Sequence, residues 1–587
     1  MYQELFTNNF ILNFLTSFLF ICFNILFSLC VSFKLNKNQI VIFKKFQPII
    51  IFYIIFVLYS FFFNILILFD GHKYFDLVFY FTLLMQVIFF TKNIYFFKNH
   101  KFKKYLKQIN KTEKFIIFFS SILFLISILP ISDADSIAIH QNLANTIYLD
   151  GFKSIDLNKN VAFLIFSNTQ NLLIISPILN SDNFGTQLNL IILVFFIFYN
   201  FKDHKKFSLI LFSSPLIIYF ISTQKLQLFF GILYLLLFII INKELIKSKL
   251  GLFITIFLLI FYSSGNLSYI LFSIPLYFYL FLKFHKSWKF IIIFSIISFI
   301  IILFPMLMIK QIYFKNIFAP FFDNIFGQNN SLYNSYALNI RSSGGWIKDP
   351  SNILLYLKPF ISFNINQLSS SLGIIFLLML LNIELLKKTK FFPIIIFIIV
   401  FFTGQLLPRY YFEAFLILAY YATLKDIISK LTVYFFNFTI IIIAITFTYI
   451  SYISENVLNN KENYMNRFSY TYYNSQQYKN LKIDGNLLDF SSARPSTFFN
   501  RNIYSVRSLN LLYDGIENKK QTANFINKNS INYIIANTID FLPSCIVIEK
   551  IAEANSKVIM RNFLRNRIDR KSNTKTLNIH KIKSNNC

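Results

Sequence analysis

Two carboxylates and an imidazole directly follow an apolar segment near residue 130. The run Phe115–Ile131 is apolar enough for a membrane helix, and Asp133, Asp135 and His140 come just after it. Paired carboxylates suit Mg²⁺ or Mn²⁺, which keep several waters and bind substrate phosphates. One carboxylate can instead act as a base toward a hydroxyl or amine. The spacing therefore predicts a catalytic or metal site at the end of this helix, with Asp133 and Asp135 as its acidic groups.

Helix capping is a simpler interpretation of the same residues. Ser132, Asp133 and Asp135 are good N-cap residues for a helix over residues 138–149, and capping needs only one of them. On that helix Ser136 and His140 would share a polar face, raised toward a lipid headgroup. Its membrane-facing side would hold Ile137, Leu143 and Ile147. Capping alone leaves the second Asp and His140 without a role, so both interpretations stay open.

The segment before this helix indicates its orientation. Residues 98–114 carry seven lysines against Glu113 alone. Positive flanks stay in the cytoplasm, so we expect the acidic end of Phe115–Ile131 to face outward.

The composition predicts an α-helical polytopic membrane protein. The 587 residues are 56% hydrophobic and only 14% charged, with many apolar runs near spanning length. We expect about fourteen transmembrane helices: Phe10–Phe33, Ile49–Phe69, Phe75–Phe90, Phe115–Ile131, Thr186–Phe201, Phe207–Ser222, Leu226–Ile241, Leu252–Ser264, Leu267–Leu282, Phe290–Ile309, Ser369–Leu386, Phe391–Leu407, Tyr411–Leu424 and Leu431–Ile453.

The formal net charge of +30 does not indicate nucleic-acid binding. Most lysines lie in short loops between apolar runs, where they orient helices. The partner implied by this pattern is the membrane.

Two long outer loops, 132–185 and 310–367, interrupt the predicted helices. Within the first, Val161–Leu179 is apolar at both ends and polar at its centre. Counting it as a span would move several lysine clusters outside, so charge bias favours a re-entrant or interfacial segment. The second loop holds Arg341 and a Gly-Gly-Trp turn. It either folds over a site or only covers helix ends.

The composition turns polar after residue 453. Alternating stretches predict a small extracytoplasmic α/β domain over residues 454–560, with strands at 486–490, 531–537 and 545–550 and a helix at 518–528. The basic tail 561–587 is expected to be disordered. Cys545 and Cys587 could pair in an oxidising compartment. We expect the N-terminal helices and their basic loop over residues 1–114. The transmembrane core is expected over residues 115–453.

Basic and aromatic residues at other predicted outer helix ends could bind phosphate. Arg409 follows Pro408 and can hold phosphate oxygens in a bidentate manner. It could also anchor the interface, with Tyr410 in an aromatic belt. Lys225 is a weaker candidate, because lysines at helix ends often only reach toward water. Glu413 lies one turn into the next helix and should pair with a cation or face a cavity.

The order of these features resembles the GT-C superfamily of membrane glycosyltransferases. The resemblance rests on an apolar helix, a loop opening Ser-Asp-Ala-Asp-Ser with His140 following, an amphipathic helix, many further spans and the late segment Gln405–Glu413. Such enzymes use polyprenyl-phosphate sugars, as protein O-mannosyltransferases and lipid A aminoarabinose transferases do. The resemblance implies that Asp133 or Asp135 is catalytic and that a small outer C-terminal domain is present. It departs at 223–227, where related chains often have a carboxylate and this chain has Lys225.

The resemblance implies transfer of a sugar from a polyprenyl-phosphate donor to a lipid, glycan or protein acceptor. It places the chain in the cell envelope, in a bacterial inner membrane, with its C-terminal domain extracytoplasmic. A divalent cation, Mg²⁺ or Mn²⁺, is the expected cofactor. The predicted substrate-binding residues are His140, Arg409, Tyr410, Glu413, Lys225 and Arg341. The alternatives are a flippase for lipid-linked glycans, and an O-antigen-type polymerase or ligase that would depend on Arg341.

Overall fold

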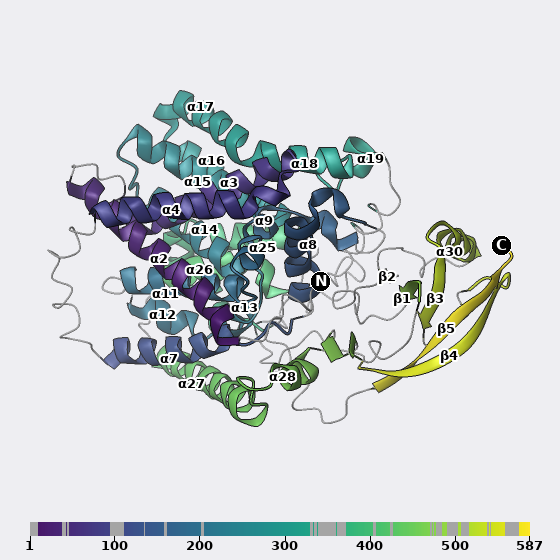
Figure 1. Ribbon diagram of the computed structural model, residues 1–587. Helices are drawn as coiled ribbons and strands as arrows, with labels where there is room; N and C mark the ends of the chain where they lie inside the picture. The colour runs from purple at the N-terminus through teal and green to yellow at the C-terminus, as the bar shows by residue number, and fades with distance from the viewer. Residues whose placement is uncertain are drawn as a thin grey trace.

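The computed structural model describes most of the chain. Its described residues are 10–37, 43, 46–93, 111–133, 135–157, 161–200, 205–328, 371–402, 407–422, 427–469, 484–489, 503–505, 516–536, 539–540, 542–557 and 574–587, with single positions between them. Most of these residues are helical and form one large body, and a small sheet lies at its side (Figure 1).

Five helical stretches in the described ranges are long and apolar enough to cross a membrane. They are Asn13–Lys37, Gln47–Leu68, His72–Asn93, His285–Phe314 and Lys430–Ser454. Four of them coincide wholly or largely with the helices α2 (Phe10–Lys37), α3 (Gln47–Leu68), α4 (Phe75–Asn93) and α27 (Ile427–Tyr449). The fifth joins α17 (Trp288–Ser298), a π-helical turn at Phe299–Leu303 and α18 (Phe304–Phe314). These lengths are consistent with a membrane protein.

Shorter helices make up much of the rest of the described body. They are α7 (Lys111–Ile128), α11 (Phe184–Asn200), α12 (Lys205–Leu211), α13 (Leu216–Ile221), α14 (Gln227–Asn242), α15 (Lys249–Ser264), α16 (Leu267–Lys283), α19 (Asp323–Phe326), α23 (Ile374–Leu380), α24 (Ile383–Lys388), α25 (Phe392–Phe402) and α26 (Phe412–Tyr421). Helix α14 is buried from Leu228 to Ile241 and packs against α11, α15 and α26. Helix α7 packs along α27 at one edge of the body (Figure 1).

Within the described residues, two of the predicted spans are interrupted. Pro215 separates α12 from α13, because its ring lacks an N–H and starts a new helix. A turn at Leu381 and Asn382 separates α23 from α24, and the Asn382 side chain caps α24 by accepting from the Leu385 N–H. Neither Phe207–Ser222 nor Ser369–Leu386 is therefore one continuous helix.

The segment after α7 winds first as a π-helical turn, Ser136–Gln141, and then as α8, Asn142–Asp150. The predicted helix is present, but its apolar side does not face lipid. Ile137, Leu143 and Ile147 are fully buried in the protein core. The expectation of an amphipathic helix resting on the membrane surface is wrong, because neighbouring helices cover that side.

The polar-centred segment Val161–Leu179 does not form one long helix. It folds as a 3-10 turn at Val161–Ile165 followed by α9 (Asn168–Leu172) and α10 (Ile175–Ile178). Its polar residues are buried and hydrogen-bonded: Asn168 contacts Asn64 and Ser264, and Asn171 contacts Ser60. None of these pieces is long enough to span a bilayer by itself.

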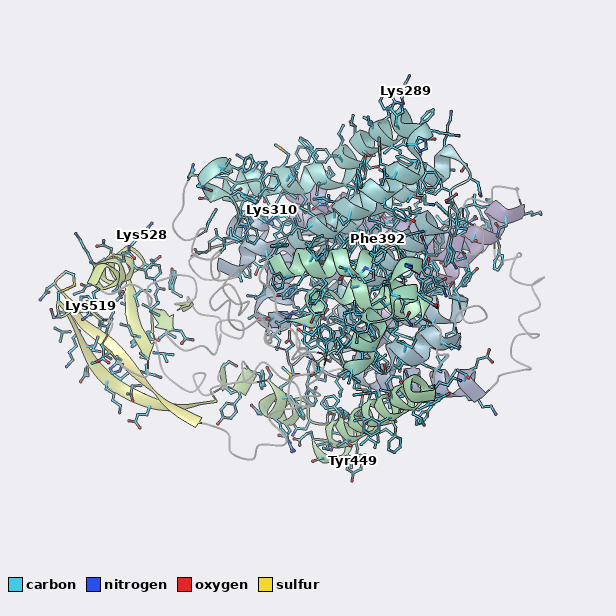
Figure 2. The ribbon with its side chains drawn as sticks, turned by 180° about the vertical axis from the view of Figure 1, so that it is seen from behind. Lys289, Lys310, Phe392, Tyr449, Lys519 and Lys528 are labelled. Carbon is cyan, nitrogen blue, oxygen red and sulfur yellow. A yellow bond between two sulfur atoms is a disulfide. The ribbon has the colours of Figure 1, made fainter. Side chains whose placement is uncertain are left out.

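The C-terminal unit is a five-stranded sheet in the order β2-β1-β3-β5-β4. Strands β1 (Asn486–Asp489), β2 (Ile503–Ser505) and β3 (Ile531–Ala536) are parallel, and β4 (Ile546–Lys557) and β5 (Thr574–Asn585) complete it in antiparallel fashion. Helix α30 (Ile516–Lys528) precedes β3, and its Ala523 and Ile526 share a buried cluster with Leu488 and Ile534. Figure 2 labels Lys519 and Lys528 of α30 on this unit, away from the helical body.

The predicted strands and helix of this unit are confirmed, whereas the tail prediction is wrong. Residues 574–585 of the tail, expected to be disordered, form β5 at the centre of the antiparallel half of the sheet. Cys545 and Cys587 form a disulfide that ties the end of the chain to the start of β4. The domain therefore continues past residue 560. Helix α28 (Lys461–Phe468) lies between α27 and this unit.

Candidate functional site

Asp133 and Asp135 both face the ammonium group of Lys225. Lys225 Nζ lies 3.5 Å from Asp133 Oδ2 and 3.3 Å from Asp135 Oδ2. The Lys225 side chain is 8% exposed, whereas the Asp135 side chain is 36% exposed. The lysine is thus enclosed while one carboxylate remains open to solvent. It lies in the turn between α13 and α14, so the tertiary fold brings it to the end of α7.

The two carboxylates differ in how they are held. Asp133 Oδ2 accepts hydrogen bonds from the main-chain N–H of Ser136 at 2.8 Å and from the Ser136 hydroxyl at 2.7 Å. The hydroxyl in turn accepts from the Gln224 N–H at 3.0 Å. Asp135 makes no side-chain cap. Capping therefore accounts for Asp133, and the more exposed Asp135 has no such structural duty.

A second cation approaches from the start of α26. Arg409 Nη1 donates to the Tyr219 hydroxyl at 2.6 Å, and Lys225 Nζ donates to the same oxygen at 2.8 Å. Arg409 Nη2 also donates to the Tyr410 hydroxyl at 3.2 Å. The guanidinium carbon lies 5.0 Å from the centre of the Tyr410 ring, within the range of a cation–π contact. Tyr219 therefore holds the Lys225 and Arg409 side chains at one point.

The arrangement leaves donor capacity unused. Arg409 Nε is buried without a hydrogen-bond partner among the described residues. An unsatisfied buried donor of this kind usually marks a place where a ligand or water completes the bonding. Guanidinium groups match phosphate and carboxylate geometry, so an oxyanion is the ligand that best suits Arg409.

The local electrostatics keep both cations charged. Burial alone would lower the pKa of Lys225, but Asp133 and the Tyr219 hydroxyl hold that pKa well above its usual value. Burial also opposes the charge on Arg409, and the neighbouring Tyr219 and Tyr410 outweigh it and raise the pKa of Arg409. The positive charge of Arg409 in turn lowers the pKa of Tyr410.

His140 lies beside the same charges. Its Nδ1 is 2.8 Å from Gln170 Nε2, and it interacts electrostatically with Lys225, Asp135, Asp133 and Arg409. Burial, reinforced by Lys225, lowers the pKa of His140 to about 3. The imidazole is therefore neutral at physiological pH. A π-helical turn carries it, and such turns are frequent at functional sites.

The predicted divalent cation does not fit this arrangement. No group of three or more His, Cys, Asp or Glu side chains that could hold a metal occurs in the described part of the chain. Between the two carboxylates stands Lys225, whose ammonium occupies the position that a bridging cation would need. Asp133 and Asp135 could bind a metal only after that side chain moved, and we derive no step through one.

Glu413, another predicted site residue, has different neighbours, as does the buried Lys310. Glu413 is buried in α26 and accepts a hydrogen bond from Tyr262 at 3.1 Å, and no ion pair joins it to a cation within the described part of the chain. Lys310 donates to the carbonyl oxygens of Leu164 and Ala319, which makes it a clamp between segments (Figure 2). Arg341 lies outside the described residues.

Sequence reasoning missed several contributors. Tyr219 lies in an apolar helix with no distinguishing pattern, Gln170 is an uncharged residue of the short helix α9, and Gln224 lies in the turn before α14. It also missed a second acid–lysine pair: Asp182 Oδ2 lies 3.5 Å from Lys461 Nζ, and Asp182 Oδ1 accepts from Gln141 at 2.6 Å. One sequence signal lay near these missed residues: segment 223–227 carries Lys225 and no carboxylate.

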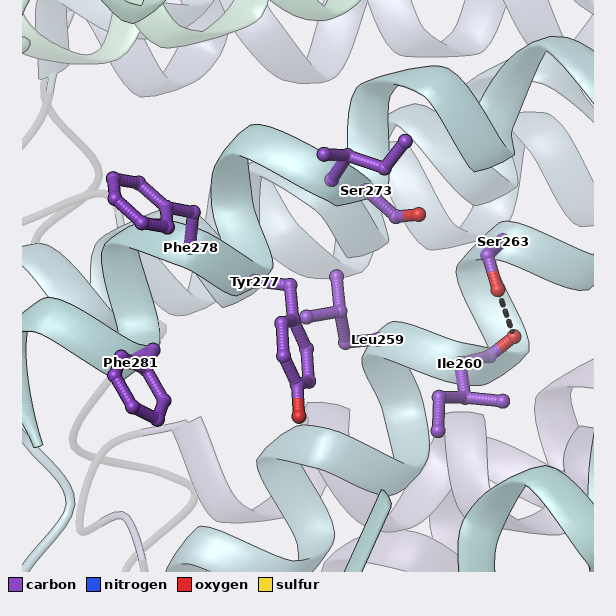
Figure 3. A pocket seen from close by; sticks show the side chains of 8 residues that line it. Leu259, Ile260, Ser263, Ser273, Tyr277, Phe278 and Phe281 are labelled. Carbon is purple, nitrogen blue, oxygen red and sulfur yellow. Dashed lines mark hydrogen bonds between the residues drawn. The ribbon is translucent and has the colours of Figure 1, made fainter. Parts of the chain in front are cut away.

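An apolar hollow on α15 and α16 is a separate feature. Leu259, Ile260, Tyr277 and Phe278 line it, and its polar groups are hydroxyls alone (Figure 3). Phe278 is 60% exposed, as expected of a residue facing lipid. The hollow holds no charged group and adds nothing to the chemistry of the carboxylate site.

Comparisons with protein-family models, with curated proteins and with solved structures found no match to this chain.

Proposed function

We propose that the chain is an integral membrane glycosyltransferase that moves a sugar from a polyprenyl-phosphate donor to a lipid, glycan or protein acceptor. The observation that carries the proposal is the convergence of Asp135, Lys225 and Arg409 on one partly open point just past the end of the apolar helix α7. An acid next to two cations serves a reaction that takes a proton from one reactant and leaves negative charge on another.

The chemistry follows from what each group can do. Arg409 and Lys225 bind the donor phosphate, in the position where both now donate to the Tyr219 hydroxyl. Asp135 accepts the proton of the acceptor hydroxyl as its oxygen bonds to the anomeric carbon. The bond from that carbon to the phosphate oxygen breaks, and the two cations stabilise the departing polyprenyl phosphate. Asp133, fixed by Ser136, positions Lys225.

The finer architecture belongs to the same proposal. About fourteen membrane passes, a GT-C-like arrangement and a bacterial inner membrane location remain our expectations. The site would then face the extracytoplasmic side, as the lysines of 98–114 indicate. The Cys545–Cys587 disulfide supports the same side for the C-terminal unit, because disulfides persist in oxidising compartments.

The two alternatives have less support. A flippase would need charges along a path through its helices, and the buried Glu413 and Lys310 are each bonded to neighbours. A polymerase or ligase would depend on Arg341. Loss of activity in Arg341→Ala with none in the carboxylate variants would favour that class over ours.

The test is an analysis of lipid-linked sugars in cells that lack this protein. We expect a polyprenyl-phosphate sugar to accumulate and its glycan product to disappear. Complementation with the natural chain should reverse both changes, and complementation with the Asp133→Asn, Asp135→Asn double variant should reverse neither. Normal glycan transfer in both single variants and in the double variant, at equal membrane abundance, would refute the proposal.

A further inference from the structure

The side chains around His140 form a hydrogen-bond chain that leads away from the carboxylates. His140 Nδ1 contacts the end of the Gln170 side chain, and the other end of that side chain lies 2.7 Å from Ser167 Oγ. Ser167 Oγ lies 2.8 Å from the main-chain oxygen of Gly265. Gln170 and Ser167 are both buried, so water cannot substitute for these bonds.

A single hydrogen atom decides the direction of this chain. Gly265 offers only a carbonyl oxygen here, which must accept, so the one hydroxyl hydrogen of Ser167 points toward it. The Thr169 hydroxyl donates to the same oxygen at 2.6 Å, which the two lone pairs of a carbonyl permit. Ser167 Oγ can therefore only accept from Gln170.

The carboxamide of Gln170 is nearly symmetric in outline, and its hydrogen-bond partners distinguish its two ends. The structure places its oxygen toward Ser167 and its NH₂ toward His140, which leaves the Gly265 and Gln170 oxygens to share the single hydrogen of Ser167. Turning the carboxamide round removes this conflict, so we assign the NH₂ group to the Ser167 side. The carboxamide oxygen then faces His140 Nδ1 and needs a donor there. The Nδ1 atom must consequently carry the imidazole proton. In a neutral ring this leaves Nε2 unprotonated, with a lone pair.

We propose that His140 Nε2 is a fixed hydrogen-bond acceptor that binds a hydroxyl group of the substrate at the Asp135–Lys225–Arg409 site. The described residues offer Nε2 no hydrogen-bond partner, although His140 lies among the charges of that site. The proton position on His140 stands by itself, whereas the binding of a substrate hydroxyl rests on the glycosyltransferase function proposed above. Lys225 and Arg409 can only donate, and Asp135 takes up the proton of the reacting hydroxyl, so a fixed acceptor beside them suits a further sugar or acceptor O–H and not a phosphate oxygen.

The proton position can be measured without any activity. We would label the histidines of the full-length protein with ¹⁵N and record nitrogen spectra of the membrane-embedded chain, which has six His residues. The signals lost in His140→Asn, and independently in His140→Gln, belong to His140. A neutral ring with the proton on Nδ1 is the expected result. A proton on Nε2, or on both nitrogens at neutral pH, would overturn the inference.

Two substitutions separate substrate binding from a merely structural role. Asparagine reaches about as far as Nδ1 and keeps the bond to Gln170, whereas glutamine reaches about as far as Nε2 and offers a carbonyl acceptor there. We expect His140→Asn to lower kcat/KM about tenfold or more, and His140→Gln to retain more activity than His140→Asn. The reverse order would show that His140 serves only to hold Gln170. Absence of transfer in the natural chain would refute the proposed function and leave the tautomer result standing.

Discussion

Two acid–lysine pairs lie at opposite ends of one hydrogen-bonded path, and they are built differently. The Gln224 main chain donates to Ser136, which holds Asp133, while the Gln224 side chain bonds to the Asp182 carbonyl and to the Gly185 N–H. At the first end Lys225 faces two carboxylates, one of them 36% exposed. At the second, Lys461 pairs with Asp182, whose side chain is only 9% exposed.

The difference indicates that the Lys225 pair is a candidate reaction site and that the Asp182–Lys461 pair has a structural role. Burial raises the pKa of Asp182 despite the attraction of Lys461, and burial likewise lowers the pKa of Lys461. Both shifts disfavour the charged forms, and Gln141 donates a hydrogen bond to the Oδ1 atom of the carboxylate. The Asp182–Lys461 pair therefore fastens α28 to the loop before α11. The Lys225 pair keeps its charges and an opening, which is what catalysis requires.

The largest effect on transfer should come from Asp135→Asn. The change keeps the shape of the side chain and removes the base, and general base catalysis contributes roughly 100-fold or more. Lys225 remains paired with Asp133, so we expect normal membrane abundance. Sugar transfer in washed membranes, normalised to the amount of protein, measures the loss. Unchanged transfer would place the base elsewhere.

Arg409→Gln should have the next largest effect. It removes charge-assisted bonds worth about 1.5–3 kcal/mol each, so we expect transfer to fall roughly tenfold or more. The guanidinium is needed for its shape as well as its charge, and Arg409→Lys should recover only part of the activity. Arg467→Gln is a matched control. Arg467 pairs with Glu455 and is not part of the Asp135–Lys225–Arg409 site, so this variant should leave transfer unchanged.

Asp182→Asn should act on stability and hardly on chemistry. Breaking the pair leaves the Lys461 ammonium without its carboxylate, which we expect to cost about 1–3 kcal/mol of unfolding free energy. Transfer by the folded protein at low temperature should stay within about threefold of the natural chain. The double variant with Lys461→Met should regain part of the stability in thermal denaturation. A loss of transfer as large as that of Asp135→Asn would contradict the distinction between the two pairs.

Metal chelation should leave transfer almost unchanged. Because the Lys225 ammonium already stands between Asp133 and Asp135, the phosphate charge is neutralised by protein cations. We would measure transfer in membranes washed with EDTA, with and without added Mg²⁺ or Mn²⁺. A strict dependence on either ion would mean that Lys225 moves aside and that the two carboxylates bind the metal.

Cys545→Ser should have the smallest effect on transfer. The disulfide joins residues 42 apart and lies in the C-terminal sheet unit, so we expect about 2–4 kcal/mol less stability there and unchanged transfer. Limited proteolysis should cut the variant faster within the C-terminal unit. Equal protease resistance would show that β4 and β5 hold the sheet without the cross-link.

The sequence by itself determined the helical class, the bounds of helices such as α14 and α16 to within a few residues, and the presence of a small C-terminal α/β unit. Those features depend on local hydrophobicity and on alternation along one strand or helix. The same local signals identified four candidate catalytic or binding residues near helix ends: Asp133, Asp135, His140 and Arg409. They could not show that α8 would be covered by protein, or that residues 574–585 would add a strand.

Only the tertiary structure decided which of these residues meet. Lys225 lies 90 residues from Asp135, and Arg409 lies 190 residues from Tyr219, so no local pattern couples them. Helices α7, α13 and α26 bring them together because each buries its apolar face against its neighbours. The proton position on His140 likewise depends on Ser167 and Gly265, which meet only after the chain has folded. Side-chain type is local information, whereas the pairing of charges and the direction of a hydrogen bond depend on packing.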